Sequence, residues 1–125
     1  MADLKEKGCT LLSTTTVSLA TNTQTTLYTV PAGKRCILSY AILVAGADAA
    51  TTDIAIGQNG ATTDFLTTTN LGLVNAEFDA AILQPIPGAN VLLSKSYAAG
   101  TVIEINVTNQ AGGATNTVYL YGTLY

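Results

Sequence analysis

Short runs of β-branched and aliphatic residues, separated by glycine, proline and asparagine turns, recur along almost the whole chain. Such runs favour β-strands, because branched side chains suit the half-buried surface of a pleated sheet. The pattern predicts strands at 11–19, 25–30, 34–45, 52–58, 62–67, 78–84, 90–94, 101–108 and 117–125. Short strands at this regular spacing predict an all-β fold, an antiparallel jelly-roll-like sandwich of about eight strands.

The length of 125 residues fits one domain. We expect a single β-sandwich domain at 13–125, preceded by a short N-terminal arm at 1–12. The arm begins MADLKEKGC, which is polar and mixed in charge. It has no apolar stretch of the kind that a signal peptide needs, so we expect the protein to be made in the cytoplasm and not exported.

Two turn signals mark strand boundaries. Pro31-Ala32-Gly33 predicts a type I turn with proline at the second position and glycine at the fourth. Asn59-Gly60 predicts a tight hairpin. Lys34 and Arg35 follow the first turn and are expected to start the next strand. They are either a solvated strand end or a pair of cations that meets a neighbouring chain.

Alternation assigns faces within the last two predicted strands. Ile103, Ile105 and Val107 share one face and are expected in the core. In the final strand, one face carries Val118, Leu120 and Leu124, and the other carries Tyr119, Tyr121 and Tyr125. The aliphatic face is expected in the core. The tyrosine face is either a second buried layer or a contact surface, because tyrosine is enriched at interfaces.

Charged residues are scarce: they make up 10% of the chain, against about 25% of a typical domain. Threonine, asparagine, alanine and glycine take their place, which suits a protein that packs against neighbours. The net charge of −3 predicts no nucleic-acid partner, since such binding needs a basic face. No apolar run is long enough to span a bilayer, so we expect no membrane partner.

The chain contains no histidine, which excludes Ser-His-Asp and Cys-His catalytic arrangements. We therefore expect no enzymatic activity, no cofactor and no metal site. Cys36 lies in an apolar run and is expected to be a buried thiol, not disulfide-bonded to Cys9. Four carboxylates could form catalytic pairs but are expected to be solvated turn residues: Asp48 with Asp53, and Glu77 with Asp79.

The stretch TLYTVPAGKRCILSYAILVAG and the later SYAAGTVIEINVTN resemble the corner motifs of small β proteins of tailed bacteriophage particles, most closely capsid decoration proteins. The resemblance covers roughly 11–125. It implies a jelly-roll-like sandwich, commonly a homotrimer, that binds the outside of a virion and has no enzymatic activity. The implied partners are the major capsid protein and further copies of the chain, and the implied location is the outer capsid surface.

From this resemblance we expect the arm to contact the capsid through Asp3, Leu4, Lys5, Lys7, Leu11 and Leu12. The expected subunit interface consists of Tyr119, Tyr121, Tyr125, Lys34 and Arg35. Two other functions stay open at this point. One is a head-fibre base or tail component, and the other is a carbohydrate-binding module that uses the tyrosines as a platform.

Overall fold

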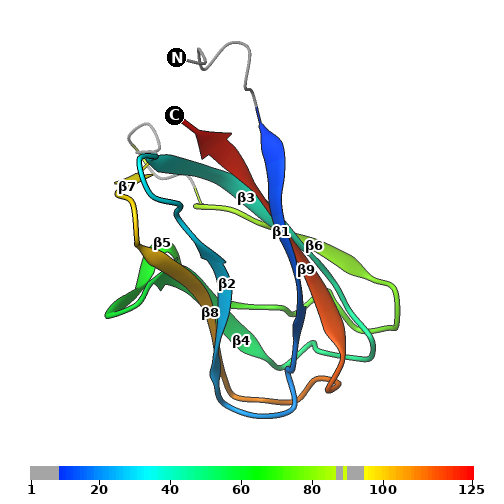
Figure 1. Cartoon of the computed structure of the whole chain (residues 1–125). Helices are drawn as coiled ribbons and strands as arrows, with labels where there is room; N and C mark the ends of the chain where they lie inside the picture. Colours follow the sequence, from blue (N-terminus) through cyan, green and yellow to red (C-terminus); the bar gives the residue numbers. More distant parts are fainter. Residues whose placement is uncertain (1–8, 87–88, 90–94) are drawn as a thin grey trace.

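The computed structural model describes residues 9–86, 89 and 95–125, and in it two antiparallel sheets pack face to face (Figure 1). The described part of the chain contains no helix. The predicted all-β sandwich is confirmed. Its strands are β1 (Thr10–Val17), β2 (Gln24–Thr29), β3 (Cys36–Val44), β4 (Asp53–Gln58), β5 (Ala61–Asn70), β6 (Ala80–Leu83), β7 (Ser96–Tyr97), β8 (Val102–Thr108) and β9 (Asn116–Leu124).

The strand pairing is nested. The first sheet has the order β1-β9-β3-β6, with the short β7 also paired to β3, and the second has the order β2-β8-β4-β5. The first strand therefore pairs with the last, β2 with β8, β3 with β6, and β4 with β5. This is the order that results when a long hairpin wraps around itself, which is the jelly-roll arrangement.

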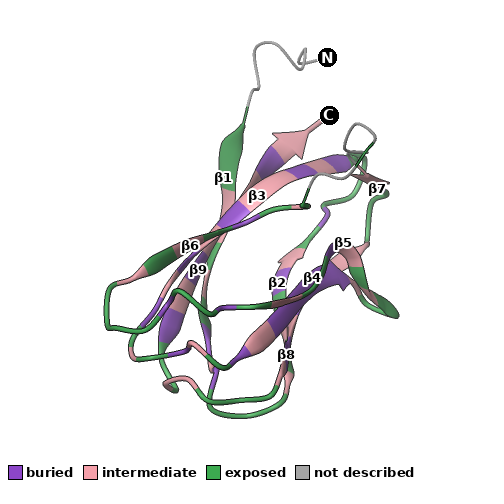
Figure 2. Ribbon diagram, turned by 180° about the vertical axis from the view of Figure 1, so that it is seen from behind, coloured by how far each residue is buried: buried purple, intermediate pink, exposed green. Residues whose placement is uncertain are grey.

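The core lies between the two sheets, where the buried residues of facing strands meet (Figure 2). Ile103, Ile105 and Val107 are buried there, as their alternation predicts. Val118 and Leu120 of β9 are also buried, whereas Leu124 packs against the core and stays half-buried. Burying each such side chain contributes about 1.5–3 kcal/mol relative to leaving it in water.

Several strand boundaries differ from the prediction. β1 begins at Thr10, so Leu11 and Leu12 lie in a strand instead of an arm. β3 begins at Cys36, and the prediction that Lys34 starts this strand was wrong because Lys34 still belongs to the preceding turn. β5 continues to Asn70, and β7 was not predicted. The strand predicted at 90–94 lies outside the described residues.

Of the two predicted turns, one is confirmed and the other is of a different type. Asn59-Gly60 joins β4 to β5 with Gly60 at φ 87°, so the hairpin is confirmed. In the other turn the Lys34 N–H donates to the Pro31 carbonyl at 3.3 Å, which makes proline the first residue. Gly33 is then third, with φ 74°. A positive φ at this position belongs to a type II turn, so the predicted type I turn was wrong.

Candidate assembly surface

The outer face of the first sheet is built from every second residue of its strands, and we call it the tyrosine face. Strand register places these residues in rows that run across the sheet. The rows are Leu11, Tyr121 and Tyr40; Thr14, Tyr119, Ile42 and Ile82; and Thr16, Thr117, Val44 and Ala80.

Aromatic and aliphatic side chains occupy the middle of the tyrosine face. The rings of Tyr40 and Tyr121 stack with centroids 4.9 Å apart and planes at 22°. Tyr119 and Ile42 are directly opposite each other on neighbouring strands. The central side chains are half-buried against one another, while Leu11 is 50% exposed and Ile82 is 68% exposed. The face is therefore a preformed, partly apolar layer that still contacts solvent.

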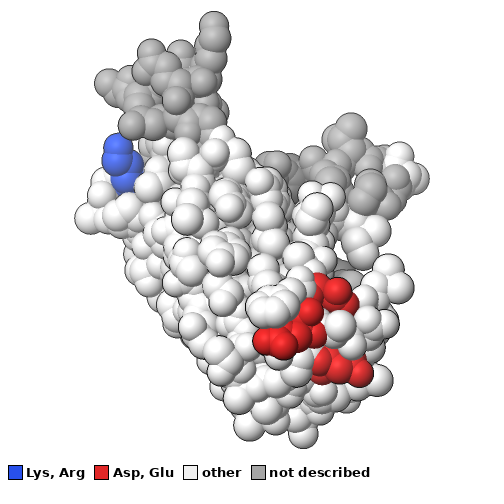
Figure 3. All heavy atoms as spheres, turned by 90° about the vertical axis from the view of Figure 1, so that its right-hand side faces the viewer, with Lys and Arg blue, Asp and Glu red and all other residues white. Residues whose placement is uncertain are grey.

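None of the residues in these rows is charged. Figure 3 shows one side of the molecule, on which acidic side chains gather in one area and a basic group lies at the opposite end. The second sheet provides an internal comparison, because its outward positions include Gln24, Asp53 and Asn106. An antiparallel sheet commonly keeps a polar outer face where it meets water. The outward positions of the second sheet that meet solvent are polar, although Ala55 and Glu104 in the same rows are buried.

The predicted interface tyrosines do not all behave alike. Tyr119 and Tyr121 lie on the tyrosine face. Tyr125 follows β9 and is held by its own chain: its hydroxyl forms a 2.7 Å hydrogen bond with Ser96 Oγ, and its backbone pairs with that of Arg35 at 2.8 and 3.0 Å. Tyr125 is thus part of the internal structure at one end of the sheet.

The two cations after the turn also differ. Arg35 Nε donates to Ser96 Oγ at 2.9 Å and its Nη2 donates to the Ser96 carbonyl at 3.1 Å. These bonds tie β7 to the start of β3. Lys34 is exposed, and its side chain has no hydrogen bond or ion pair with the residues that the structure describes. Of the pair, Lys34 is the cation available to a partner.

The expected capsid-contact residues Asp3, Leu4, Lys5 and Lys7 lie outside the described residues. Leu11 and Leu12 are in β1, where a bulge between Leu11 and Ser13 separates their directions. Leu11 is outward beside Tyr121, whereas Leu12 packs against the core. Leu11 therefore belongs to the tyrosine face and Leu12 to the core.

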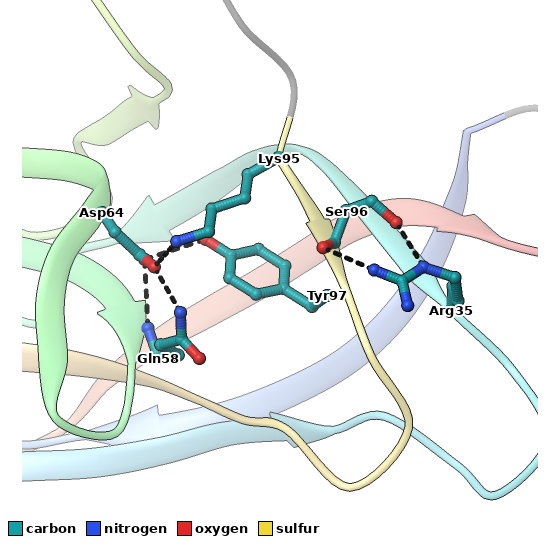
Figure 4. Close-up of polar contacts among 6 residues, drawn as sticks. All are labelled: Arg35, Gln58, Asp64, Lys95, Ser96 and Tyr97. Atoms are coloured by element: carbon teal, nitrogen blue, oxygen red, sulfur yellow. Dashed lines mark hydrogen bonds and ion pairs between the residues drawn. The ribbon is translucent and has the colours of Figure 1, made fainter.

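A polar cluster around Asp64 joins the two sheets (Figure 4). The Asp64 carboxylate accepts hydrogen bonds from Lys95 Nζ at 2.5 Å, Gln58 Nε2 at 2.7 Å and the Tyr97 hydroxyl at 2.9 Å. It also accepts the Gln58 backbone N–H at 3.2 Å. Since Tyr97 is in β7 and Gln58 ends β4, the cluster holds one edge of the sandwich closed.

Asp64, Tyr97 and Cys36 keep one protonation state around neutral pH, because their pKa values are shifted away from it. Burial raises the pKa of the Asp64 carboxyl, but hydrogen bonds from Lys95, Gln58 and Tyr97 outweigh it, so the net shift is downward. The pKa of Tyr97 is raised, first by burial and then by Asp64. Burial raises the pKa of the Cys36 thiol to about 11, which keeps it protonated. These groups therefore serve as a fixed carboxylate, a hydroxyl donor and a buried thiol.

The other carboxylates and cysteines have local roles. Asp79 Oδ2 accepts the N–H groups of Asn75 and Ala76, and Asp48 accepts the N–H of Ala50. Both cysteines are free, with Cys36 buried as predicted. Among the described residues, no group of three or more His, Cys, Asp or Glu could hold a metal ion, and no helix is long and apolar enough to cross a membrane.

Sequence reasoning missed much of the tyrosine face and the whole Asp64 cluster. A bulge between Leu38 and Tyr40 shifts the alternation of β3, so counting every second residue from the buried Leu38 wrongly places Tyr40 and Ile42 on the core face. No local sequence pattern indicates the contact between Asp64 and Lys95, because the two residues are 31 positions apart in the chain. Their contact exists only once the sheets have packed.

Comparison of the chain with protein-family models, with curated proteins and with solved structures finds no match. Any assignment of function therefore rests on the residues, the fold and the surface described above.

Proposed function

We propose that this protein is a non-enzymatic structural component of a tailed-bacteriophage particle, a capsid decoration protein. Copies of the chain associate through the tyrosine face into a trimer. The trimer binds the outside of the shell, over junctions between major capsid subunits, and stabilises the head by adding contacts across those junctions.

The observation that carries this proposal is the uncharged tyrosine face. Protein interfaces are depleted of charge at their centre and enriched in tyrosine, and the central rows of this face contain Tyr40, Tyr119 and Tyr121 but no charged residue. The contrast with the polar outer face of the second sheet supports a contact surface specific to one side of the sandwich. The corner motifs described above supply the likeness to phage particles.

The N-terminal arm is the proposed capsid contact. Because β1 begins at Thr10 and the Cys9 side chain contacts Tyr40, the arm that can be removed without touching the sandwich is residues 1–8. Its sequence offers Asp3, Leu4, Lys5 and Lys7 to a partner. Contacts of these residues with the major capsid protein would add to the free energy with which the trimer binds the shell.

Deleting 2–8 tests this role. We expect the shortened chain to keep its melting temperature and oligomeric mass, because no described strand is cut. Its co-sedimentation with shells assembled from the major capsid protein of the same genome should fall at least tenfold. A matched variant replaces residues 2–8 by a glycine-serine segment of equal length. If the deleted chain still coats shells like the wild type, the arm is not the capsid contact.

A sugar-binding module is the second candidate. It is supported by the partly exposed rings of Tyr119 and Tyr121 on an open sheet. However, one face of the Tyr121 ring is already occupied by Tyr40, which leaves less of it for a sugar to stack on. A glycan array decides between the two: a specific hit that disappears in Tyr119→Ala would favour the sugar-binding module.

A further inference from the structure

A second apolar surface lies beside β6, and we call it the apolar rim. It consists of Leu73 and Phe78, which are 93% and 78% exposed. Leu73 and Ile82 border a groove of about 570 Å3 between the end of β5 and β6. Large apolar side chains with this exposure are unfavourable in water unless they contact a partner, so the rim is a candidate docking surface.

The backbone at Phe78, one of the two residues of the rim, is strained. Phe78 has φ 70°, a left-handed conformation that a bulky residue rarely adopts. The conformation is held by a 2.8 Å hydrogen bond from the Phe78 N–H to the Ala45 carbonyl and by the Asp79 carboxylate, which accepts two backbone N–H groups of the same turn. Strain of this kind is retained where it has a use.

Symmetry requires a second surface if the tyrosine face forms a closed trimer. In a two-fold dimer one patch can meet itself, but a three-fold ring needs two different patches, one from each neighbour. The three rows of the face span about 14 Å along the strands and about 14 Å across the four strands. Its flat area of about 200 Å2 is well below the ~800 Å2 per partner of a standard interface. A copy that also offers its apolar rim makes two contacts instead of one.

Charge favours the same pairing. Glu77 is exposed next to Phe78, and Lys34 is exposed just before β3, at the end of the tyrosine face. Neither side chain has a hydrogen bond or ion pair with the described residues of its own chain. Glu77 lies by the turn beyond the end of β3 and Lys34 lies before its start, so opposite charges flank the two surfaces that a head-to-tail contact would join.

We propose that the apolar rim is the second half of the subunit contact, and that it packs against the tyrosine face of a second copy of this chain. The inference rests on the proposed self-association and names the surface that completes it. Each copy then gives its rim to one neighbour and its face to the other, which closes a ring of three.

Mixing two variants tests the proposal. Leu73→Glu places a charge on the rim and Tyr119→Glu places one on the face, while Gln24→Glu adds the same charge to the second sheet as a control. By light scattering after size exclusion, we expect wild type and Gln24→Glu at three times the 12.8 kDa chain mass and each of the other two variants at the chain mass. An equimolar mixture of Leu73→Glu and Tyr119→Glu should form a two-chain species, since one intact rim and one intact face remain.

A trimeric Leu73→Glu would overturn the rim while leaving self-association through the face intact. Absence of the mixed two-chain species would also overturn it, because the intact face of Leu73→Glu would then fail to bind the intact rim of Tyr119→Glu. A wild-type chain that stays monomeric would remove the proposed self-association and the rim together. A trimer that assembles as expected but does not bind shells would overturn only the decoration function.

Phe78→Asn provides a readout that a purely structural residue would not give. Asparagine tolerates the left-handed conformation, so the variant should melt a few degrees higher than its parent when both carry Tyr119→Glu and are monomeric. In the wild-type background the same substitution should shift the midpoint of trimer dissociation at least tenfold toward higher concentration. Unchanged trimer dissociation would contradict the proposal.

Discussion

At the residue scale, Asp64 shows how one carboxylate can organise an edge of the sandwich. It accepts hydrogen bonds from Gln58 at the end of β4 and from Lys95 and Tyr97 in the segment of β7. The Asp64 side chain is 16% exposed and that of Lys95 is 42% exposed, so solvent screens the ion pair in part. The stabilising effect comes mainly from several charge-assisted hydrogen bonds that converge on one acceptor.

Asp64→Asn should lower the free energy of unfolding by about 1–2 kcal/mol at neutral pH, measured by urea denaturation. The pKa of Asp64 is lowered in the folded state, so its contribution is complete above the pKa of the unfolded chain, about 3.9. The contribution is lost as pH falls through the lower folded pKa. The difference between wild type and variant should therefore shrink in acid.

Asp48→Asn is the matched control for this substitution, because Asp48 is exposed and accepts only the Ala50 N–H. It should change the unfolding free energy by less than about 0.5 kcal/mol. An Asp64→Asn variant as stable as this control at neutral pH would show that the cluster is not stabilising.

At the element scale, β9 is the central strand on which the first sheet depends. It pairs with β1 on one side and with β3 on the other, and its residues alternate between the core and the tyrosine face. Gly122 lies where both neighbouring strands approach closely. A Cβ there would be 2.6 Å from the Ile37 carbonyl oxygen and 2.8 Å from Leu12 Cδ1. Glycine is thus required by packing at this position.

Gly122→Ala should reduce stability by about 2–3 kcal/mol, because the added methyl group overpacks a well-filled site. Thermal unfolding followed by circular dichroism measures the effect. Thr117→Ala is the control, since Thr117 lies on the outer face of the same strand, and it should cost no more than about 0.5 kcal/mol. Equal melting temperatures for the two variants would contradict the crowding argument.

At the scale of the whole molecule, the two sheets present different surfaces to solvent. The first sheet carries the uncharged tyrosine face, and the second carries polar and acidic side chains. A sandwich with this asymmetry suits a protein that is covered on one side by a partner. Lys34 precedes β3 and Asp48 follows it, so opposite charges flank this strand and favour one orientation of the partner.

The melting temperature should depend on concentration if the tyrosine face is buried in an assembly. An assembly that binds only folded chains stabilises them by mass action. Between about 1 and about 100 µM, the melting temperature of the wild type should therefore rise by several degrees. The Tyr121→Ser variant should melt at one temperature throughout this range. A concentration-independent wild type would argue against the assembly.

The sequence by itself determined where most strands lie and which of their residues enter the core. Ile103, Ile105 and Val107 were predictable because alternation is a local property of a strand, and Asn59-Gly60 was predictable because a tight turn needs a residue with positive φ. The tyrosines of β9 share a direction for the same reason, and two of them, Tyr119 and Tyr121, lie on the predicted face.

Only the tertiary structure decided which strands pair and what their side chains meet. Pairing of β1 with β9 joins opposite ends of the chain, and no local pattern encodes a contact of that range. The same holds for Asp64 with Lys95 and for Tyr40 with Tyr121. The left-handed Phe78 is imposed by the neighbouring loop through Ala45. Local sequence sets backbone preference and facing, whereas packing between distant segments selects the contacts from which this surface is built.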